Sequence, residues 1–222
     1  MDWISVTLPN TVTIIDDYAF YGCLGLTEIF MPNSVIAIGS QAFYGCIGLS
    51  SLTIGENVLT IKDSAFEKCN AVTKVIIPKR NITFGDMIFW YCSALTKIHN
   101  LSPTPQSIGG SSFSGVPKNT CKLYVPIGSY DAYRSHNVWG LFNNIIEEEY
   151  NSILEIYEEN ISIFHIDGGI SVISNDIVNI DIFNLTGQLI YKSTFSESKE
   201  ILLEKGVYIL SINGEKSKII IK

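Results

Sequence analysis

The cysteines are the residues whose spacing most directly raises a question of chemistry. The chain contains five, and four of them, Cys23, Cys46, Cys69 and Cys92, recur every 23 residues. Cysteines at regular spacing can form disulfides in an oxidising compartment. If 23-residue units stack, however, equivalent side chains point the same way into the core, and parallel side chains seldom reach the torsion angles of a disulfide. Because buried cysteine behaves as a small apolar residue, we expect free thiols in the core.

Other groups that commonly carry catalysis or metal binding are sparse. Histidine occurs only at His99, His136 and His165. No CxxC pair or cysteine–histidine cluster has the spacing of a metal site, and the GxSxG, HExxH and P-loop motifs are absent. The sequence leaves open a triad assembled from distant residues. We nevertheless expect a protein that is not an enzyme and that uses no metal and no cofactor.

Composition limits the remaining classes of function. Of the 222 residues, 46% are hydrophobic and 17% are charged, which indicates a buried core rather than a disordered chain. The net charge of −7 argues against a nucleic-acid partner, because phosphate binding needs a footprint of lysine and arginine. No stretch of about 18 apolar residues is present, so we expect no transmembrane segment. The first residues, Met1-Asp2-Trp3-Ile4, lack the basic and apolar regions of a signal peptide.

A repeat of 23 residues organises the first half of the chain. Besides the cysteines, three kinds of position recur in the same phase: Phe20, Phe43, Phe66 and Phe89; Leu26, Leu49, Val72 and Leu95; and Pro9, Pro32 and Pro78, with Gly55 in the remaining place. This period lies within the range of leucine-rich repeats, whose units each supply one strand and a short turn or helix. One unit cannot bury its apolar face alone, so the units are predicted to stack into a solenoid with a shared core.

The solenoid is expected to cover residues 1–147. At its C-terminal end the repeat weakens, and 123–126 is predicted to be the last strand, followed by a short helix at 129–134. Three apolar residues would then cover the open end of the stack: Trp139, Phe142 and Ile145. At the other end, Trp3 falls in the leucine column, so the chain starts inside a repeat. An exposed first strand invites pairing with another chain, and we expect an edge-strand dimer there as one form of assembly.

Residues 148–222 have a different pattern. Apolar residues alternate with polar ones, as at Val178, Ile180 and Ile182, which indicates half-buried strands. Asn213-Gly214 is a strong hairpin turn. Six or seven short strands at this spacing predict a small antiparallel β-sandwich. The fold class expected for the whole chain is therefore mainly β, with a leucine-rich-repeat solenoid followed by this β-sandwich domain.

Two families share these motifs. The repeat with Pro-Asn-Ser-Val, Ile-Gly and Ala-Phe-Tyr-Gly-Cys resembles the BspA-like leucine-rich-repeat family of bacterial surface proteins. The C-terminal part resembles the sorting domain of the type IX secretion system, through Ile182-Phe183-Asn184-Leu185-Thr186-Gly187-Gln188, Gly206-Val207-Tyr208-Ile209 and the final Lys218-Ile219-Ile220-Ile221-Lys222. These resemblances imply an exported protein of a Bacteroidetes-type bacterium, located at the cell surface or outside the cell.

The candidate binding residues lie between the repeat columns. In each predicted strand, the residues that alternate with the inward ones would face the concave side of the solenoid, which repeat proteins use as a binding surface. They are Glu28, Phe30, Ser51, Thr53, Lys74, Ile76, Lys97 and His99. The alternative is a solvated sheet with ordinary variation. A second row, Tyr21, Tyr44, Glu67 and Trp90, could stack on sugars, but packing on the flank of the solenoid is the favoured interpretation.

Together these patterns predict a non-catalytic surface protein that binds a host or bacterial surface protein or a glycan through its solenoid, as in adhesion. The second hypothesis is a structural spacer or display scaffold that has no ligand of its own. A contiguous apolar or charged patch on the concave face would favour the first hypothesis over the second.

Overall fold

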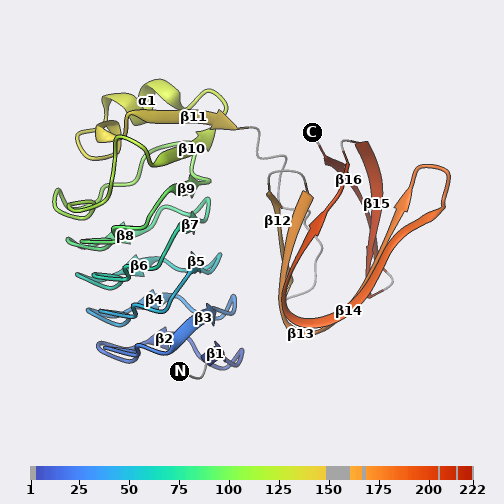
Figure 1. The fold of residues 1–222 in the computed structure, drawn as a ribbon, viewed down its shortest axis with the longest axis horizontal. Helices are drawn as coiled ribbons and strands as arrows, with labels where there is room; N and C mark the ends of the chain where they lie inside the picture. Colours follow the sequence, from blue (N-terminus) through green and yellow to red (C-terminus); the bar gives the residue numbers. More distant parts are fainter. Residues whose placement is uncertain (1–3, 149–160, 167–168, 205, 214, 222) are drawn as a thin grey trace. The chain divides into compact units, whose positions relative to one another are not determined.

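The computed structural model describes residues 4–148, 161–166, 169–204, 206–213 and 215–221. The chain folds as two compact units, residues 1–149 and 150–222 (Figure 1). The first unit is the leucine-rich-repeat solenoid, and the second is built from antiparallel strands. The expected mainly β fold class is confirmed. The described helices include none that is long and apolar enough to cross a membrane.

Parallel strands along one side of the solenoid form its main sheet. They are β1 (Ile4–Thr7), β3 (Leu26–Phe30), β5 (Ser51–Thr53), β7 (Lys74–Ile77), β9 (Lys97–Asn100), β10 (Lys122–Pro126) and β11 (Asn144–Glu148). Strands β5 to β11 are hydrogen-bonded in chain order, and β1 pairs with β3. Between these two groups, the Ser50 amide donates to the Thr27 carbonyl at 3.2 Å, which continues the stack.

A second parallel sheet closes the other side of each turn. Its strands are β2 (Ile14–Ile15), β4 (Ala37–Ile38), β6 (Thr60–Ile61) and β8 (Thr83–Phe84). Each strand has only two residues, and the second is buried in every case. One inward residue per turn is enough here because the core is already filled by the repeat columns.

The phenylalanine column forms the centre of this core. Neighbouring rings from Phe20 to Phe113 stack with centroid distances of 5.0 to 5.8 Å and nearly parallel planes. Stacked units therefore repeat the same contact, which explains why one residue type recurs every 23 positions. The fully buried rings are those of Phe43, Phe66, Phe89 and Phe113.

The cysteine column lies beside these rings. All five thiols are free, and the Sγ atoms of Cys46, Cys69 and Cys92 each lie 3.2 Å from the carbonyl of a phenylalanine 26 residues earlier. Burial raises the pKa of Cys46 and of Cys92 to about 12. Cys23 differs from the expectation because it is exposed. It belongs to the first turn, and no described turn stacks on that side of it.

Four of the turns contain two left-handed backbone positions, and the turn with Gly115 contains the second of them. The first is occupied by non-glycine residues with φ of 54° to 61° at Tyr18, Gln41, Ser64 and Met87. The second is glycine in three units but Lys68 and Tyr91 in two others, with φ of 59° and 57°. Because side chains strain a left-handed backbone, those two substitutions of the repeat need compensating contacts.

At the C-terminal end of the solenoid, two helices and an additional strand follow β10. Helix α1 (Tyr130–Ser135) and the short helix η1 (Trp139–Leu141) follow β10, and Phe113 contacts Trp139 and Phe142 at centroid distances of 4.9 and 5.0 Å. The prediction that 123–126 is the last strand is wrong. Ile145 is part of β11 and pairs in register with Leu123, and it packs against the same solenoid core.

The described part of the second unit contains five antiparallel strands, fewer than the six or seven expected. They are β12 (Ile161–Ile166), β13 (Gly169–Asn184), β14 (Leu189–Leu202), β15 (Gly206–Ile212) and β16 (Glu215–Ile221). The count is lower because β13 and β14 form one long hairpin whose register shifts between Ser174 and Val178. The first part of β13 pairs with β12 and its last part with β15. The buried core of this unit includes Val178, Ile180 and Ile182, as the alternation predicts.

Candidate functional site

The outer face of the main sheet carries most of the predicted binding residues in two continuous rows. In-register pairing places Ser51, Lys74, Lys97, Lys122 and Asn144 side by side, and we call these residues the lysine row. The same pairing aligns a second set, called the ring row: Thr53, Ile76, His99, Tyr124 and Ile146. The residues between the rows, such as Val75 and Ile98, are buried in the core.

Lysines occupy three consecutive places in the lysine row. Lys97 and Lys122 are exposed, and Lys74 is half-buried. Neighbouring strands lie about 4.8 Å apart, so the three side chains leave the sheet along one line across it. Like charges directly opposite one another are destabilising, so this arrangement weakens the sheet.

Two aromatic rings and a carboxylate adjoin the lysines. The His99 and Tyr124 rings stack at a centroid distance of 4.5 Å with an interplanar angle of 6°. His99 Nδ1 also lies 3.4 Å from an oxygen of Glu148, which ends β11. The imidazole is therefore held between a ring and a carboxylate, and its side chain is only 15% exposed.

The other predicted residues are placed less uniformly. Glu28 and Ser51 are exposed and Thr53 is half-buried, so these side chains reach the outer face. Ile76 is 6% exposed, so the expectation that it is an exposed strand position is wrong, although its register keeps it in the ring row. The side chain of Phe30 lies outside the described part of the structure.

Sequence reasoning missed Lys122 and Tyr124. Both lie on β10, which was recognised as a strand, and the same alternation that selected Lys97 and His99 would have selected them. It also missed a column of hydroxyl residues beside the lysine row. The side chains of Ser50, Thr73 and Thr96 each donate to the carbonyl of the equivalent residue in the preceding unit, at 3.1 to 3.4 Å.

The aromatic row on the flank is engaged with itself. Tyr21 and Tyr44 stack at 4.8 Å with an interplanar angle of 3°. Lys68 then lies over the Tyr44 ring at 4.8 Å and over the Trp90 ring at 5.4 Å. A sugar would need a free π face, but these faces are in contact with a neighbouring ring or with the Lys68 ammonium. The arrangement therefore supports packing rather than sugar binding.

The same contacts explain how Lys68 can occupy a left-handed backbone position. Glu67 takes the aromatic position of its unit but is buried, and the Lys68 ammonium lies 3.5 Å from its carboxylate. Lys68 also donates to the Tyr44 hydroxyl. This hydrogen bond is the main cause of the raised pKa of Lys68. The cation thus fills the gap in the aromatic row and compensates for the strained backbone.

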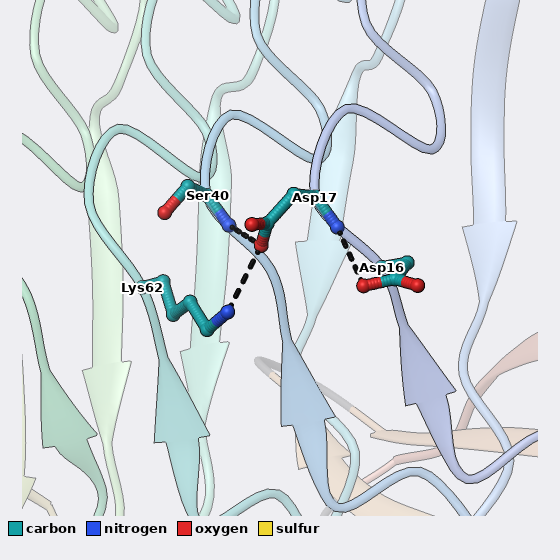
Figure 2. Close-up of polar contacts among 4 residues, drawn as sticks. All are labelled: Asp16, Asp17, Ser40 and Lys62. Atoms are coloured by element: carbon teal, nitrogen blue, oxygen red, sulfur yellow. Dashed lines mark hydrogen bonds and ion pairs between the residues drawn. The ribbon is translucent and has the colours of Figure 1, made fainter.

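A polar cluster joins three consecutive turns just beyond the C-terminal ends of β2, β4 and β6, as Figure 2 shows. Asp17 Oδ1 accepts hydrogen bonds from the Ser40 amide at 2.8 Å and from the Lys62 ammonium at 3.1 Å. The Ser40 hydrogen bond and then Lys62 lower the pKa of Asp17. Asp63 repeats the contact by accepting from the Asp86 amide at 2.8 Å. These carboxylates cap backbone amides, so their role is to hold turns together.

No metal centre emerges from these groups. Among residues 4–148, 161–166, 169–204, 206–213 and 215–221, histidine, cysteine, aspartate and glutamate side chains form no cluster of three that is suited to a metal ion. The outer face of the main sheet, with its lysine row and ring row, is the candidate functional site, and it presents a charged and polar surface.

Comparisons with known proteins cover both units. The BspA type leucine rich repeat region matches residues 2–121 in six copies, and the secretion system C-terminal sorting domain matches residues 153–222. No curated protein matches the chain.

Several solved structures are similar to the chain. A leucine rich repeat protein of T. pallidum is 27% identical, with a TM-score of 0.49, over 57% of this chain and 60% of that one. A leucine rich cell surface protein from Faecalibacterium prausnitzii A2-165 is 24% identical, with a TM-score of 0.44, over 68% and 33% of the two chains. A leucine-rich-repeat protein from Bacteroides ovatus ATCC 8483 is 21% identical, with a TM-score of 0.38, over 65% and 43%. The chain thus spans between a third and three fifths of the length of these proteins.

Proposed function

Because the chain belongs to the BspA-type leucine-rich-repeat family and ends in a secretion sorting domain, we propose that it is a non-catalytic adhesion-type protein of the cell surface. Its solenoid binds a surface protein or glycan of a host or of another bacterium through the outer face of the main sheet. The C-terminal unit serves export and attachment.

One observation carries this proposal. The predicted residues Lys74, Lys97 and His99 are continued in register by Lys122 and Tyr124, so one charged and polar surface spans neighbouring strands. A spacer needs only a soluble face, and nothing in that role calls for aligned lysines that repel each other. The continuity of the two rows therefore favours binding over the spacer hypothesis.

To identify the partner, we would measure the binding of the full chain to a panel of immobilised matrix proteins and glycans. The double variant His99→Ala/Tyr124→Ala removes both rings from the face. Tyr21→Ala removes an exposed ring from the flank and serves as the matched control. We expect the double variant to lose most of the binding and the control to retain it. Equal binding by all three proteins, or no binding across a broad panel, would contradict the proposal.

Self-association is a further part of the proposed assembly. Strand β1 pairs with β3, and β3 is continued toward β5. The other edge of β1 would then pair with a second chain, since backbone groups at an edge remain available for hydrogen bonding. Sedimentation at high concentration tests this, and a strict monomer would exclude the dimer.

A further inference from the structure

The long hairpin of the second unit exposes several apolar side chains at its end. The loop 185–188 joins β13 to β14, and Figure 1 shows this hairpin in orange. Leu185, Leu189 and Ile190 are 65%, 46% and 47% exposed, and we call these three residues the hairpin tip. Single exposed apolar residues are ordinary, whereas apolar residues that gather at one place mark a surface for a partner.

The hairpin tip lies in an uncharged segment. Residues 182–191 include no aspartate, glutamate, lysine or arginine. The charged residues that border this segment, Asp181 and Lys192, lie opposite one another in the β13–β14 ladder and form an ion pair of 3.2 Å. Glu204, just before β15, is an exposed carboxylate at the same end of the sheet, because β15 begins beside the end of β13. Attraction to an anionic partner is therefore not what the hairpin tip provides.

The backbone of the loop is hydrogen-bonded within the hairpin. Asn184 Oδ1 accepts from the amides of Thr186 and Gln188 at 3.1 and 2.9 Å. The Gly187 amide donates to the Asn184 carbonyl at 3.0 Å, and the Asn184 amide donates to the Gln188 carbonyl at 2.9 Å. The Thr186 hydroxyl also donates to Asn184 Oδ1. Groups that are paired in this way can leave water without the cost of an unsatisfied donor, which is the condition for entering a lipid layer.

These features favour a lipid surface over a protein as the partner. A protein that binds an apolar residue supplies a desolvated pocket and a polar rim with hydrogen bonds. The loop has little to offer such a rim, because the amides of Thr186, Gly187 and Gln188 are already used within the hairpin. A lipid layer needs exposed apolar side chains on a paired backbone, and the hairpin tip has both.

We propose that the hairpin tip inserts into the boundary between the headgroups and the acyl chains of a lipid layer, with Leu185, Leu189 and Ile190 as its anchors. This inference rests on the proposed function, which gives the second unit a role in attachment, and it names the surface to which that unit attaches. Binding through so few side chains is shallow and reversible.

The test measures how much of the full chain sediments with phosphatidylcholine vesicles. We expect binding that persists as the salt concentration rises and that added phosphatidylglycerol does not strengthen, because apolar contact rather than charge carries it. The variant Leu185→Ser/Leu189→Ser should weaken partitioning into the vesicles by about tenfold or more, since two of the three anchors are lost. Binding that requires phosphatidylglycerol and disappears with salt would contradict insertion of the hairpin tip.

The matched control is Ile177→Ser/Leu141→Ser, which removes two apolar side chains that are 70% and 52% exposed. Ile177 lies in the middle of β13, and Leu141 ends helix η1 of the solenoid. This variant should partition into vesicles as the unchanged chain does. Both variants should keep the circular dichroism spectrum of the unchanged chain, because each replaces exposed residues only. An equal loss of binding in the two variants would overturn the assignment to the hairpin tip.

A tryptophan at the hairpin tip gives a direct measurement of insertion. In Leu185→Trp, brominated phosphatidylcholine should quench the added fluorescence, whereas in Ile177→Trp the added fluorescence should be unaffected. Equal quenching in the two variants would contradict insertion at the hairpin tip. No binding of the unchanged chain to any of the vesicles would also overturn the proposal, and the exposed leucines would then belong to a protein interface.

The lipid inference and the proposed function fail in distinguishable ways. If vesicles do not bind while His99→Ala/Tyr124→Ala still abolishes binding to a matrix protein or glycan, the lipid inference alone is wrong. If vesicles bind through the hairpin tip while the ring variant leaves binding to the panel unchanged, the solenoid surface is wrongly assigned and the lipid inference stands.

Discussion

His99 and Tyr124 lie face to face on adjacent strands, with ring centroids 4.5 Å apart and planes inclined by 6°. One comes from a regular repeat and the other from the strand that follows the degenerate fifth unit, yet the pairing of β9 with β10 keeps them in register. The outer face thus continues past the point at which the sequence repeat fades.

The phenylalanine column should dominate stability. Phe66→Ala removes a fully buried ring that stacks on Phe43 and Phe89, and we expect a loss of about 3–5 kcal/mol in the free energy of unfolding. Tyr21→Ala, which truncates a half-exposed ring, should cost far less. Denaturant unfolding followed by circular dichroism compares the two. Similar midpoints for both variants would show that the column is not the core.

The glycine of the Ile-Gly motif should be intolerant of any side chain. In Gly39→Ala the new Cβ would lie 2.4 Å from the Asp17 backbone nitrogen, so the turns must shift apart. We expect a loss of about 1–3 kcal/mol in thermal unfolding experiments. Gly110→Ala is the matched control because its Cβ would meet nothing within 4 Å. If the control is as destabilising as Gly39→Ala, close approach of the turns is not the reason.

The thiols should separate into one reactive and four protected groups. Cys23 is exposed, whereas burial raises the pKa of Cys46, Cys69, Cys92 and Cys121. Since the thiolate is the species that reacts, native protein treated with iodoacetamide should gain one adduct, and denatured protein should gain five. Intact-mass spectrometry counts them. Fewer than five adducts after denaturation without reductant would reveal a disulfide.

The contact between Asp17 and Ser40 should make part of the free energy of unfolding depend on pH in the acid range. The folded pKa of Asp17 lies below its ordinary value of 3.8, so the charged form stabilises the fold above that pH. The contribution is lost as the pH falls through the lower, folded pKa. Asp17→Asn should therefore flatten the acid side of the stability profile, which urea unfolding at a series of acid pH values measures. Parallel acid profiles for Asp17→Asn and the unchanged chain would contradict this role.

The repeat columns were predictable because the core repeats the same contact in every turn. A phenylalanine at each twenty-third position has one physical explanation, and Phe20 and Phe43 indeed stack. Strand β11 was not predictable from the columns, because Asn144–Glu148 lies outside the 23-residue phase and joins the sheet only through its pairing with β10. The length of β13 was not predictable for a related reason. A register shift interrupts the alternation of apolar and polar residues along this strand.

The candidate site divides in the same way. The alternation along a strand predicts that Lys97 and His99 share a face, and the structure places them in the two rows. It does not predict how neighbours cover a residue, so Ile76 was expected to be open and is buried. Nor does a linear pattern show that Lys68 enters the gap left by Glu67, because that contact depends on Tyr44 and Trp90 from the adjacent turns.

The central claim is that the outer face of the main sheet is the binding surface. Hydroxyl-radical footprinting of the full chain, with and without the ligand that binds best in the panel, tests it most directly. We expect oxidation of Tyr124 and His99 to fall when ligand is bound, while Tyr18 and Tyr21 on the flank are oxidised as before. Protection of Tyr18 and Tyr21 with Tyr124 unchanged would contradict the claim and place the binding surface on the flank.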